Sequence, residues 1–128
     1  MAHSSLNHLN VLVIDDDEDM RTLLTRMLNR AGVRHIAVAA DGQQGLEHLE
    51  RTDHQVNFVL CDWNMPRMSG LEFFGRLKAT GRALPVLMIT GRDDVASILA
   101  ARDAGIPGYI VKPVTAQELL SKILHVAS

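Results

Sequence analysis

The stretch Leu9-Asn10-Val11-Leu12-Val13-Ile14-Asp15-Asp16 decides the fold of this chain. Its first six residues are mostly apolar and rich in β-branched side chains, a pattern typical of a strand buried on both faces of a parallel sheet. Two carboxylates end this run, and a helical pattern follows them. The apolar residues of that pattern recur with the spacing of one helix face: Met20, Leu23, Leu24, Met27, Leu28 and Ala31. Since Gly32 stands where a glycine would end the helix, residues 9–32 predict one strand–helix unit.

The same unit recurs along the rest of the chain. Further apolar runs predict strands at residues 36–39, 56–61, 86–89 and 108–111. Apolar residues at helical spacing follow them in four groups: Leu46 and Leu49; Leu71, Phe74 and Leu77; Val95, Ile98 and Leu99; and Leu119, Leu120, Ile123 and Leu124. Helix caps are expected at Asp41, at Asp93 or Asp94, and at Thr115, and helix ends at Gly81 and Gly105. Strands alternating with helices predict an α/β fold, a doubly wound (βα)5 sandwich with a five-stranded parallel sheet.

The composition excludes several classes of protein. The 128 residues suit one domain, which we expect at residues 9–128 after an N-terminal extension at residues 1–8. The single cysteine excludes an internal disulfide and a cysteine-based zinc site. No apolar run approaches the roughly 20 residues of a membrane-spanning helix, and residues 1–10 lack the apolar core of a secretory signal. The chain has no block of five or six basic residues of the kind that would indicate nucleic-acid binding. We therefore expect a cytoplasmic protein that neither inserts into a membrane nor binds nucleic acid.

Negative charge is concentrated in one segment. Lys and Arg total 13 against 15 Asp and Glu, and five of these acids form the run Asp15-Asp16-Asp17-Glu18-Asp19. Outside this run the chain has ten acidic and 13 basic residues, so the rest of the chain carries a net charge of +3. Asp17, Glu18 and Asp19 suit the first turn of a helix, where the helix dipole favours acids. A cap needs only one acid, so Asp15 and Asp16 are candidates for a functional site.

Polar residues end four of the expected strands: Asp15 and Asp16, Asp62, Thr90, and Lys112. Because the carboxyl ends of parallel strands meet at one edge of a sheet, we expect these residues to converge. Three neighbouring carboxylates repel each other, and protonation or a bound cation must relieve that repulsion; Mg²⁺ is the usual cation at such a site. Lys112 adds positive charge and Thr90 a hydrogen-bond donor, so the site suits a phosphoryl group, which one of the carboxylates is able to attack.

These residues lie in motifs that resemble those of the CheY-like response regulator receiver domains. The matching pieces are Val13-Ile14-Asp15-Asp16, Cys61-Asp62-Trp63-Asn64-Met65-Pro66, Ile89-Thr90-Gly91, and Tyr109-Ile110-Val111-Lys112-Pro113. They span nearly the whole chain. The resemblance implies a flavodoxin-like sheet with strand order 2-1-3-4-5 and a role in two-component signal transduction.

The resemblance also implies a role for each matched residue. Asp62 corresponds to the phosphoacceptor, which takes a phosphoryl group from a histidine kinase. Asp16 corresponds to a direct Mg²⁺ ligand, and Asp15 helps through water. Asn64 would offer its backbone carbonyl to the same ion. Lys112 would pair with the acyl phosphate and Thr90 would donate a hydrogen bond to it.

The remaining implied roles concern signalling. Movement of Thr90 toward the phosphate would let Tyr109 turn inward and reshape the face formed by the fourth helix, fifth strand and fifth helix. A downstream protein target would dock there. The bond before Pro113 would be cis. We expect a monomer or a weak dimer, and we expect Arg92, near the phosphate, to slow the loss of phosphate.

Two alternatives belong to other functional classes. The first is a phosphatase of the haloacid-dehalogenase type, with Asp15 as nucleophile, Asp17 beside it, and Thr90 and Lys112 as later parts. Asp19 departs from that motif, which expects Thr or Val there. The second is a receiver that binds partners without phosphate. All the matched residues of the acceptor site are present, which argues against this second alternative.

Overall fold

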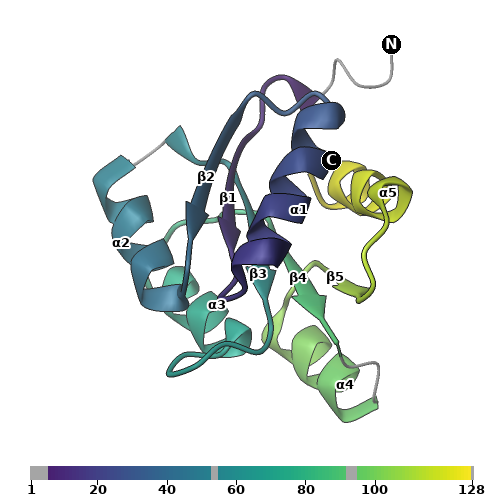
Figure 1. Cartoon of the computed structure of the whole chain (residues 1–128). Coiled ribbons are helices and arrows are strands. Elements are labelled where there is room, and N and C mark those ends of the chain that lie inside the picture. Colours follow the sequence, from purple (N-terminus) through teal and green to yellow (C-terminus); the bar gives the residue numbers. More distant parts are fainter. Residues whose placement is uncertain (1–5, 53–54, 92–94, 128) are drawn as a thin grey trace.

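The computed structural model describes residues 6–52, 55–91 and 95–127, and Figure 1 shows its ribbon. Within these residues the strands are β1 (Asn10–Ile14), β2 (His35–Ala39), β3 (Phe58–Asp62), β4 (Val86–Thr90) and β5 (Gly108–Val111). The helices that alternate with them are α1 (Glu18–Arg30), α2 (Gly42–Thr52), α3 (Gly70–Ala79), α4 (Val95–Ala104) and α5 (Ala116–Ala127). All strand pairs are parallel, and the order is β2-β1-β3-β4-β5. The expected α/β sandwich and its strand order are confirmed.

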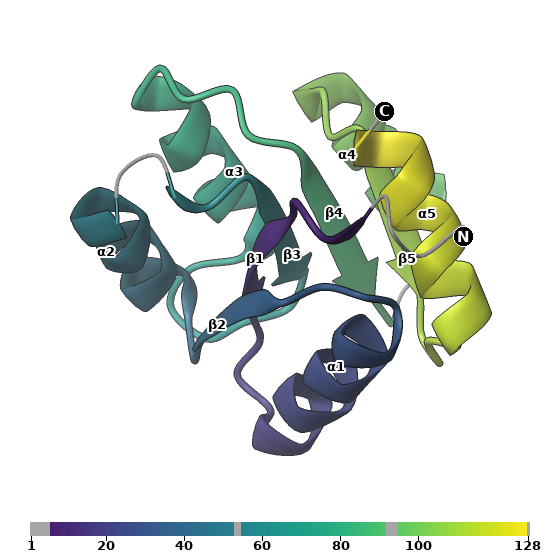
Figure 2. The ribbon, with the colours of Figure 1, turned by 90° about the horizontal axis from the view of Figure 1, so that it is seen from above.

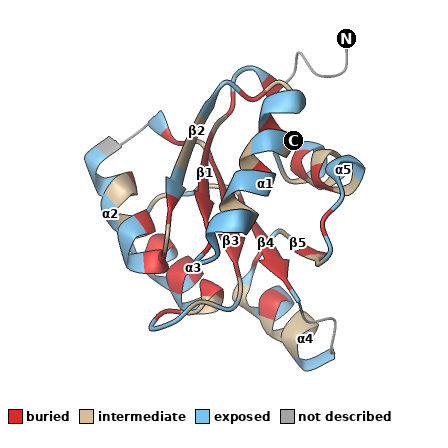
Figure 3. Cartoon of the chain, viewed as in Figure 1, coloured by how far each residue is buried: buried red, intermediate tan, exposed pale blue. Residues whose placement is uncertain are grey.

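Helices cover both faces of the sheet. Because side chains alternate along a strand, Val11 and Val13 of β1 join the core cluster that α1 and α5 complete, whereas Leu12 and Ile14 join the cluster completed by α2, α3 and α4. Figure 2 shows α1 on the opposite side of the sheet from α2 and α3. Strands β1, β3 and β4 are therefore buried almost throughout, as the red ribbon of Figure 3 shows. Burial on both faces explains why their sequences are continuously apolar.

The helix boundaries follow the expected caps. The Asp41 carboxylate accepts the Gln44 backbone N–H at 2.8 Å, and the Thr115 hydroxyl accepts that of Glu118 at 3.1 Å. The glycines expected to end helices all have positive φ: 102° at Gly32, 84° at Gly81 and 84° at Gly105. Only glycine adopts this left-handed conformation without strain, so each one stops a helix. Asp93 and Asp94, the expected caps of α4, lie outside the described residues.

The expected apolar faces are correct except at their edges. Leu23 of α1 is 43% exposed and Leu124 of α5 is 38% exposed, although the spacing placed both on core faces. In α4 the difference is larger, since Val95 and Leu99 lie in solvent and Ala101 is the buried residue. The apolar stripe that helical spacing predicts on each helix is wider than the part of the helix that packs against the sheet. Residues at the margin of the stripe therefore stay outside the core.

Other expectations concern single residues and membrane spans. Cys61 is fully buried, as expected of a small apolar core residue, and burial raises the pKa of its thiol. Leu6 is also buried and joins the α1–α5 cluster, so this residue packs onto the sandwich although it precedes position 9, while Asn7 and His8 are exposed. The domain boundaries 1–8 and 9–128 stay a prediction. No helix in the described part of the chain is both long and apolar enough to span a bilayer.

Gly70, the first residue of α3, lies against the backbone that leads out of β3. A Cβ here would lie 2.6 Å from the carbonyl oxygen of Asp62 and 3.0 Å from the Cα of Trp63. Backbone atoms cannot swing aside, so we expect Gly70→Ala to lower the free energy of unfolding in urea by about 1–3 kcal/mol. Gly75, in the same helix, has open space around that position. Gly75→Ala is therefore the matched control, and we expect it to stabilise by about 0.5–1 kcal/mol. Equal effects of the two substitutions would show that the close approach at Gly70 carries no strain.

Candidate functional site

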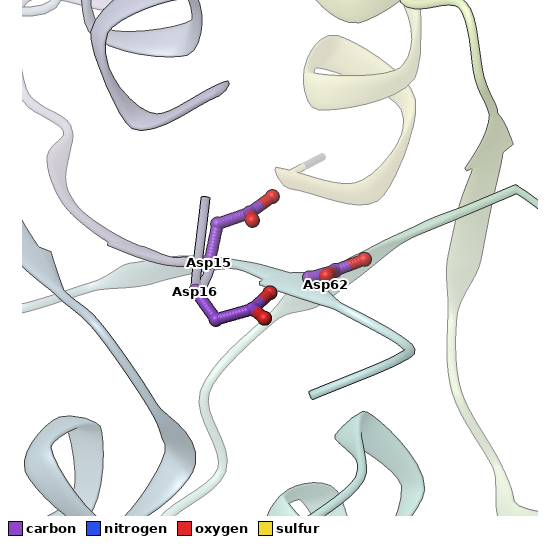
Figure 4. Close-up of side chains that lie close together, drawn as sticks. All are labelled: Asp15, Asp16 and Asp62. Carbon is purple, nitrogen blue, oxygen red and sulfur yellow. The ribbon is translucent and has the colours of Figure 1, made fainter. Parts of the chain in front are cut away.

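The parallel sheet brings the polar strand ends together. Asp15 follows β1, Asp62 ends β3, Thr90 ends β4 and Lys112 follows β5. Asp15, Asp16 and Asp62 each offer one carboxylate oxygen, and these three atoms lie within 4.8 Å of one another. Figure 4 shows the three carboxylates extending from neighbouring strand ends into a common space. The convergence expected from strand topology is therefore present.

The Asp15 side chain is held in place but not fully satisfied. It is buried, and its Oδ1 atom accepts the backbone N–H of Asp17 at 2.9 Å. Its Oδ2 atom is also buried and has no hydrogen-bond partner. Arg21 of α1 donates from Nη1 to the Asp15 carbonyl oxygen at 2.7 Å, which fixes the backbone at the end of β1. A buried carboxylate oxygen without a partner is costly, so this atom marks a position that suits a ligand.

Asp62 lies deeper than its charge would favour. It is 4% exposed, and the Lys112 Nζ atom is 3.4 Å from its Oδ1 atom. Burial raises the pKa of Asp62 to about 6, and the charges of Asp15 and Asp16 add to this effect, whereas Lys112 opposes it. Burial likewise raises the pKa of Asp15, against the hydrogen bond from Asp17 and the charge of Lys112. One ammonium group therefore does not balance the cluster, which retains excess negative charge.

The donor set fits a small hard cation. Three carboxylates converge, and one of them carries a buried oxygen without a partner; the Lys112 ammonium lies 3.4 Å from Asp62. Carboxylate oxygens are the ligands that Mg²⁺ prefers in proteins. Asp15, Asp16 and Asp62 are thus the residues able to hold such an ion. Asp16 is exposed, which leaves this side of the site open to solvent.

Thr90 and Tyr109 lie on the other side of Asp62. Thr90 is buried at the end of β4, while Tyr109 of β5 is half-buried. Both line a small cavity whose remaining walls come from Trp63, Ser97, Ile98 and Ala101. The two residues therefore share one packing environment, as their expected coupling requires.

The loop between β3 and α3 carries Asn64, which is exposed and lies two residues after Asp62. Its anchors are the Trp63 N–H, which donates to the Ile89 carbonyl at 2.8 Å, and the Gly70 N–H, which donates to the Trp63 carbonyl at 2.8 Å. The peptide bond between Lys112 and Pro113 is cis. Arg92 lies outside the described residues.

Two contacts of the segments that carry the site residues were not expected from the sequence. Arg21 reaches the end of β1, and Arg67 of the β3–α3 loop forms an ion pair with Asp41 at 3.0 Å. The Arg21 contact was predictable in principle, because a side chain one turn into α1 points back toward the strand that precedes the helix. No sequence pattern indicated the Arg67 contact, because it depends on a loop conformation with positive φ.

The fold and the site together define a doubly wound α/β domain with an acidic, lysine-containing site at the carboxyl edge of its parallel sheet. The response regulator receiver domain model matches residues 11–124. The chain belongs to this family, and it is therefore a signalling domain of the two-component type.

Curated relatives agree with this membership. The chain is 38% identical over 117 residues to the chemotaxis protein CheY of Pseudomonas aeruginosa, an alignment that covers 90% of this chain and 93% of that protein. It is 37% identical over 118 residues to CheY-3 of Vibrio cholerae, with 91% and 89% coverage.

Solved structures share the fold. CheY4 of Vibrio cholerae has a TM-score of 0.82 at 28% identity, covering 92% of this chain and 98% of that one. A receiver domain protein from Clostridium thermocellum has a TM-score of 0.84 at 27% identity, with 92% and 93% coverage. A chain of the CheX–CheY–BeF3–Mg complex from Borrelia burgdorferi reaches 0.91 over 100% of this chain and 99% of that one, and at 22% identity it shows the fold alone.

Membership in the receiver family argues against the phosphatase alternative, in which Asp15 would be the nucleophile. The structure gives Asp17, the second acid of that motif, a different task, because its side chain caps α1 by accepting the Asp19 N–H at 3.0 Å. A receiver domain is a signalling domain rather than a conventional enzyme.

Proposed function

We propose that this chain is a phosphorylation-operated switch whose phosphoacceptor is Asp62. The observation that carries this proposal is the joint placement of three carboxylates, Lys112 and Thr90 at one edge of the sheet. The phosphodonor is a histidine kinase that carries a phosphohistidine. The reaction takes place in the cytoplasm, and the protein acts as a monomer or a weak dimer.

Phosphoryl transfer requires little covalent chemistry from the protein. A carboxylate oxygen of Asp62 attacks phosphorus, the new O–P bond forms, and the P–N bond to the donor imidazole breaks with its electron pair returning to nitrogen. Lys112, already beside Asp62, stabilises the negative phosphoryl oxygens, and the Thr90 hydroxyl donates a hydrogen bond to one of them. Attack of water on phosphorus later releases inorganic phosphate and restores the carboxylate.

Asp15, Asp16 and Asp62, together with the backbone carbonyl of Asn64, are the groups that would hold Mg²⁺. When bound, the ion neutralises charge on the phosphoryl oxygens. The carboxylates bind it best in their ionised form, so the raised pKa of Asp62 and Asp15 makes proton and metal compete for the same site.

The output surface consists of α4, β5 and α5. Thr90 moves toward the new phosphate, and Tyr109 turns into the space behind it. Tyr109 and Thr90 line the same small cavity, which supports this coupling, and the Lys122 ammonium lies 6.0 Å from the Tyr109 ring centroid. Exposed Val95 and Leu99 give α4 apolar contact area for a downstream protein target.

Intact-mass spectrometry tests the proposal. The wild-type protein incubated with acetyl phosphate and Mg²⁺ is expected to gain about 80 Da, the mass of one phosphoryl group. The gain should vanish in Asp62→Asn, which keeps the size of the side chain but removes the nucleophile. Asp103→Asn, which changes an exposed carboxylate of α4, is the matched control and should still label.

Two results would count against this function. Label that persists in Asp62→Asn and is lost in Asp15→Asn would make Asp15 the nucleophile. A wild-type protein that never gains mass and has no measurable Mg²⁺ affinity would point to a receiver that works without phosphate.

A further inference from the structure

Arg67 occupies an unusual backbone conformation in the loop between β3, which ends at Asp62, and α3. Its φ is 69°, in the left-handed region that favours glycine. The Met68 N–H donates to the Pro66 carbonyl at 2.7 Å, so Arg67 is the central residue of a γ-turn with positive φ, a rare and strained form. Such strain persists only where the surrounding structure holds it in place.

An ion pair supplies one of these constraints. The Arg67 Nη2 atom lies 3.0 Å from Oδ2 of Asp41, whose Oδ1 atom caps α2 by accepting the Gln44 N–H. The Asp41 side chain is 13% exposed, so it is a well-fixed partner even though the arginine is in solvent. One carboxylate therefore connects the start of α2 to the β3–α3 loop.

Packing beneath the loop acts at the same place. Met68 is buried, and a Cβ on Gly42 would lie 2.7 Å from its sulfur atom, so the first residue of α2 and the loop are in close contact. The loop is thus fixed at Trp63 by backbone hydrogen bonds and at Arg67 and Met68 by α2. Asn64 lies between these two fixed points.

We propose that the Arg67–Asp41 ion pair is a positioning device for the divalent-cation site: it holds the strained turn so that the backbone carbonyl of Asn64 faces the carboxylates of Asp15 and Asp62. Arg67 is a positioning residue, since it acts through the loop. The inference depends on the proposed function, in which this carbonyl is a metal ligand.

Charge makes the idea testable, because positioning and simple electrostatics predict opposite signs. Arg67→Gln removes a positive charge near an acidic site, so electrostatics alone would tighten Mg²⁺ binding. If the ion pair positions the loop, Arg67→Gln should weaken binding by about fivefold to tenfold. Asp41→Asn keeps an oxygen to cap α2 but loses the ionic partner, and it should weaken binding by a similar factor. Electrostatics alone also predicts weaker binding in this variant, so the sign of the Arg67→Gln effect decides between the two explanations. The double variant should be no weaker than the weaker single variant.

The measurement is a Mg²⁺ titration followed by fluorescence of Trp63, the only tryptophan and the neighbour of Asp62. Arg76→Gln is the control, since Arg76 is an exposed arginine that pairs with Glu72 on α3, and the variant has the same charge change. It should bind Mg²⁺ as tightly as the wild type or slightly more so. Urea unfolding of each variant separates affinity from stability.

Arg67→Gly gives a second, independent arm. Glycine adopts the positive φ without strain and so needs the ion pair less; this variant should be at least as stable as Arg67→Gln and should recover part of the Mg²⁺ affinity that Arg67→Gln loses. Affinity in Arg67→Gln equal to or above that of Arg76→Gln would overturn the inference. A wild-type protein that does not bind Mg²⁺ would instead overturn the proposed function, so the two failures are distinct.

Discussion

Replacing Asp62 with asparagine is expected to stabilise the metal-free protein by about 3 kcal/mol near pH 8, although it removes the proposed phosphoacceptor. The reason is the pKa of Asp62, which burial raises from 3.8 to about 6. A shift of about two pKa units, at 1.36 kcal/mol each, is the free energy by which the fold disfavours the charged carboxylate. Asparagine keeps the shape and has no charge to bury.

The pH dependence has a defined sign. The folded state binds the Asp62 proton more tightly than the unfolded chain, so wild-type stability decreases as pH rises from about 4 to about 6 and then stays low. The advantage of Asp62→Asn should therefore be largest above pH 6 and disappear toward pH 4.

Urea unfolding in EDTA at several pH values measures this. Asp103→Asn, in which an exposed carboxylate of α4 is replaced, should change the free energy of unfolding by less than about 0.5 kcal/mol at every pH. Added Mg²⁺ should stabilise the wild type more than the Asp62 variant, because binding to the folded state alone raises its stability. Equal or lower stability of Asp62→Asn at about pH 8 would show that the buried carboxylate is not destabilising.

The second large effect distinguishes acids that stand side by side in the sequence. Asp15→Asn and Asp16→Asn are each expected to weaken Mg²⁺ binding about 100-fold, because each removes a charged oxygen that holds the ion, directly at Asp16 and through water at Asp15. Asp17→Asn makes the same change of charge one residue further on. The Asp17 side chain caps α1, and asparagine also caps helices, so this variant should bind Mg²⁺ within about threefold of the wild type.

Equilibrium titration followed by Trp63 fluorescence compares the three variants at one ionic strength. If the run acted only as a diffuse negative patch, all three substitutions would weaken binding alike. Mg²⁺ binding by Asp17→Asn that is as weak as binding by Asp15→Asn would therefore contradict a defined ligand set. Far-ultraviolet circular dichroism checks that α1 remains folded in each.

The sequence predicted the sheet and the ends of its strands because both depend on local patterns. A strand buried on both faces must be apolar throughout, and parallel strands must end at one edge, so Asp15, Asp62, Thr90 and Lys112 were bound to converge. The helix ends were equally local, since Gly32 and Gly105 need their positive φ.

Features that depend on relative placement were not predictable. The spacing of Leu23, Val95 and Leu99 could not show where the sheet stops covering a helix. The contact of Arg67 with Asp41 joins residues 26 apart through a turn that few residues adopt. The burial that raises the pKa of Asp62 likewise arises only when the packed helices and neighbouring strands surround it.

Chemical trapping of the phosphorylated residue tests the central claim most directly. Borohydride reduces an aspartyl phosphate to homoserine, and peptide mass mapping then locates the modified position. After treatment with acetyl phosphate and Mg²⁺, homoserine should appear at position 62 and at no other aspartate. Homoserine at position 15 or 16, or none in protein that has gained one phosphoryl group, would contradict the assignment of Asp62 as the phosphoacceptor.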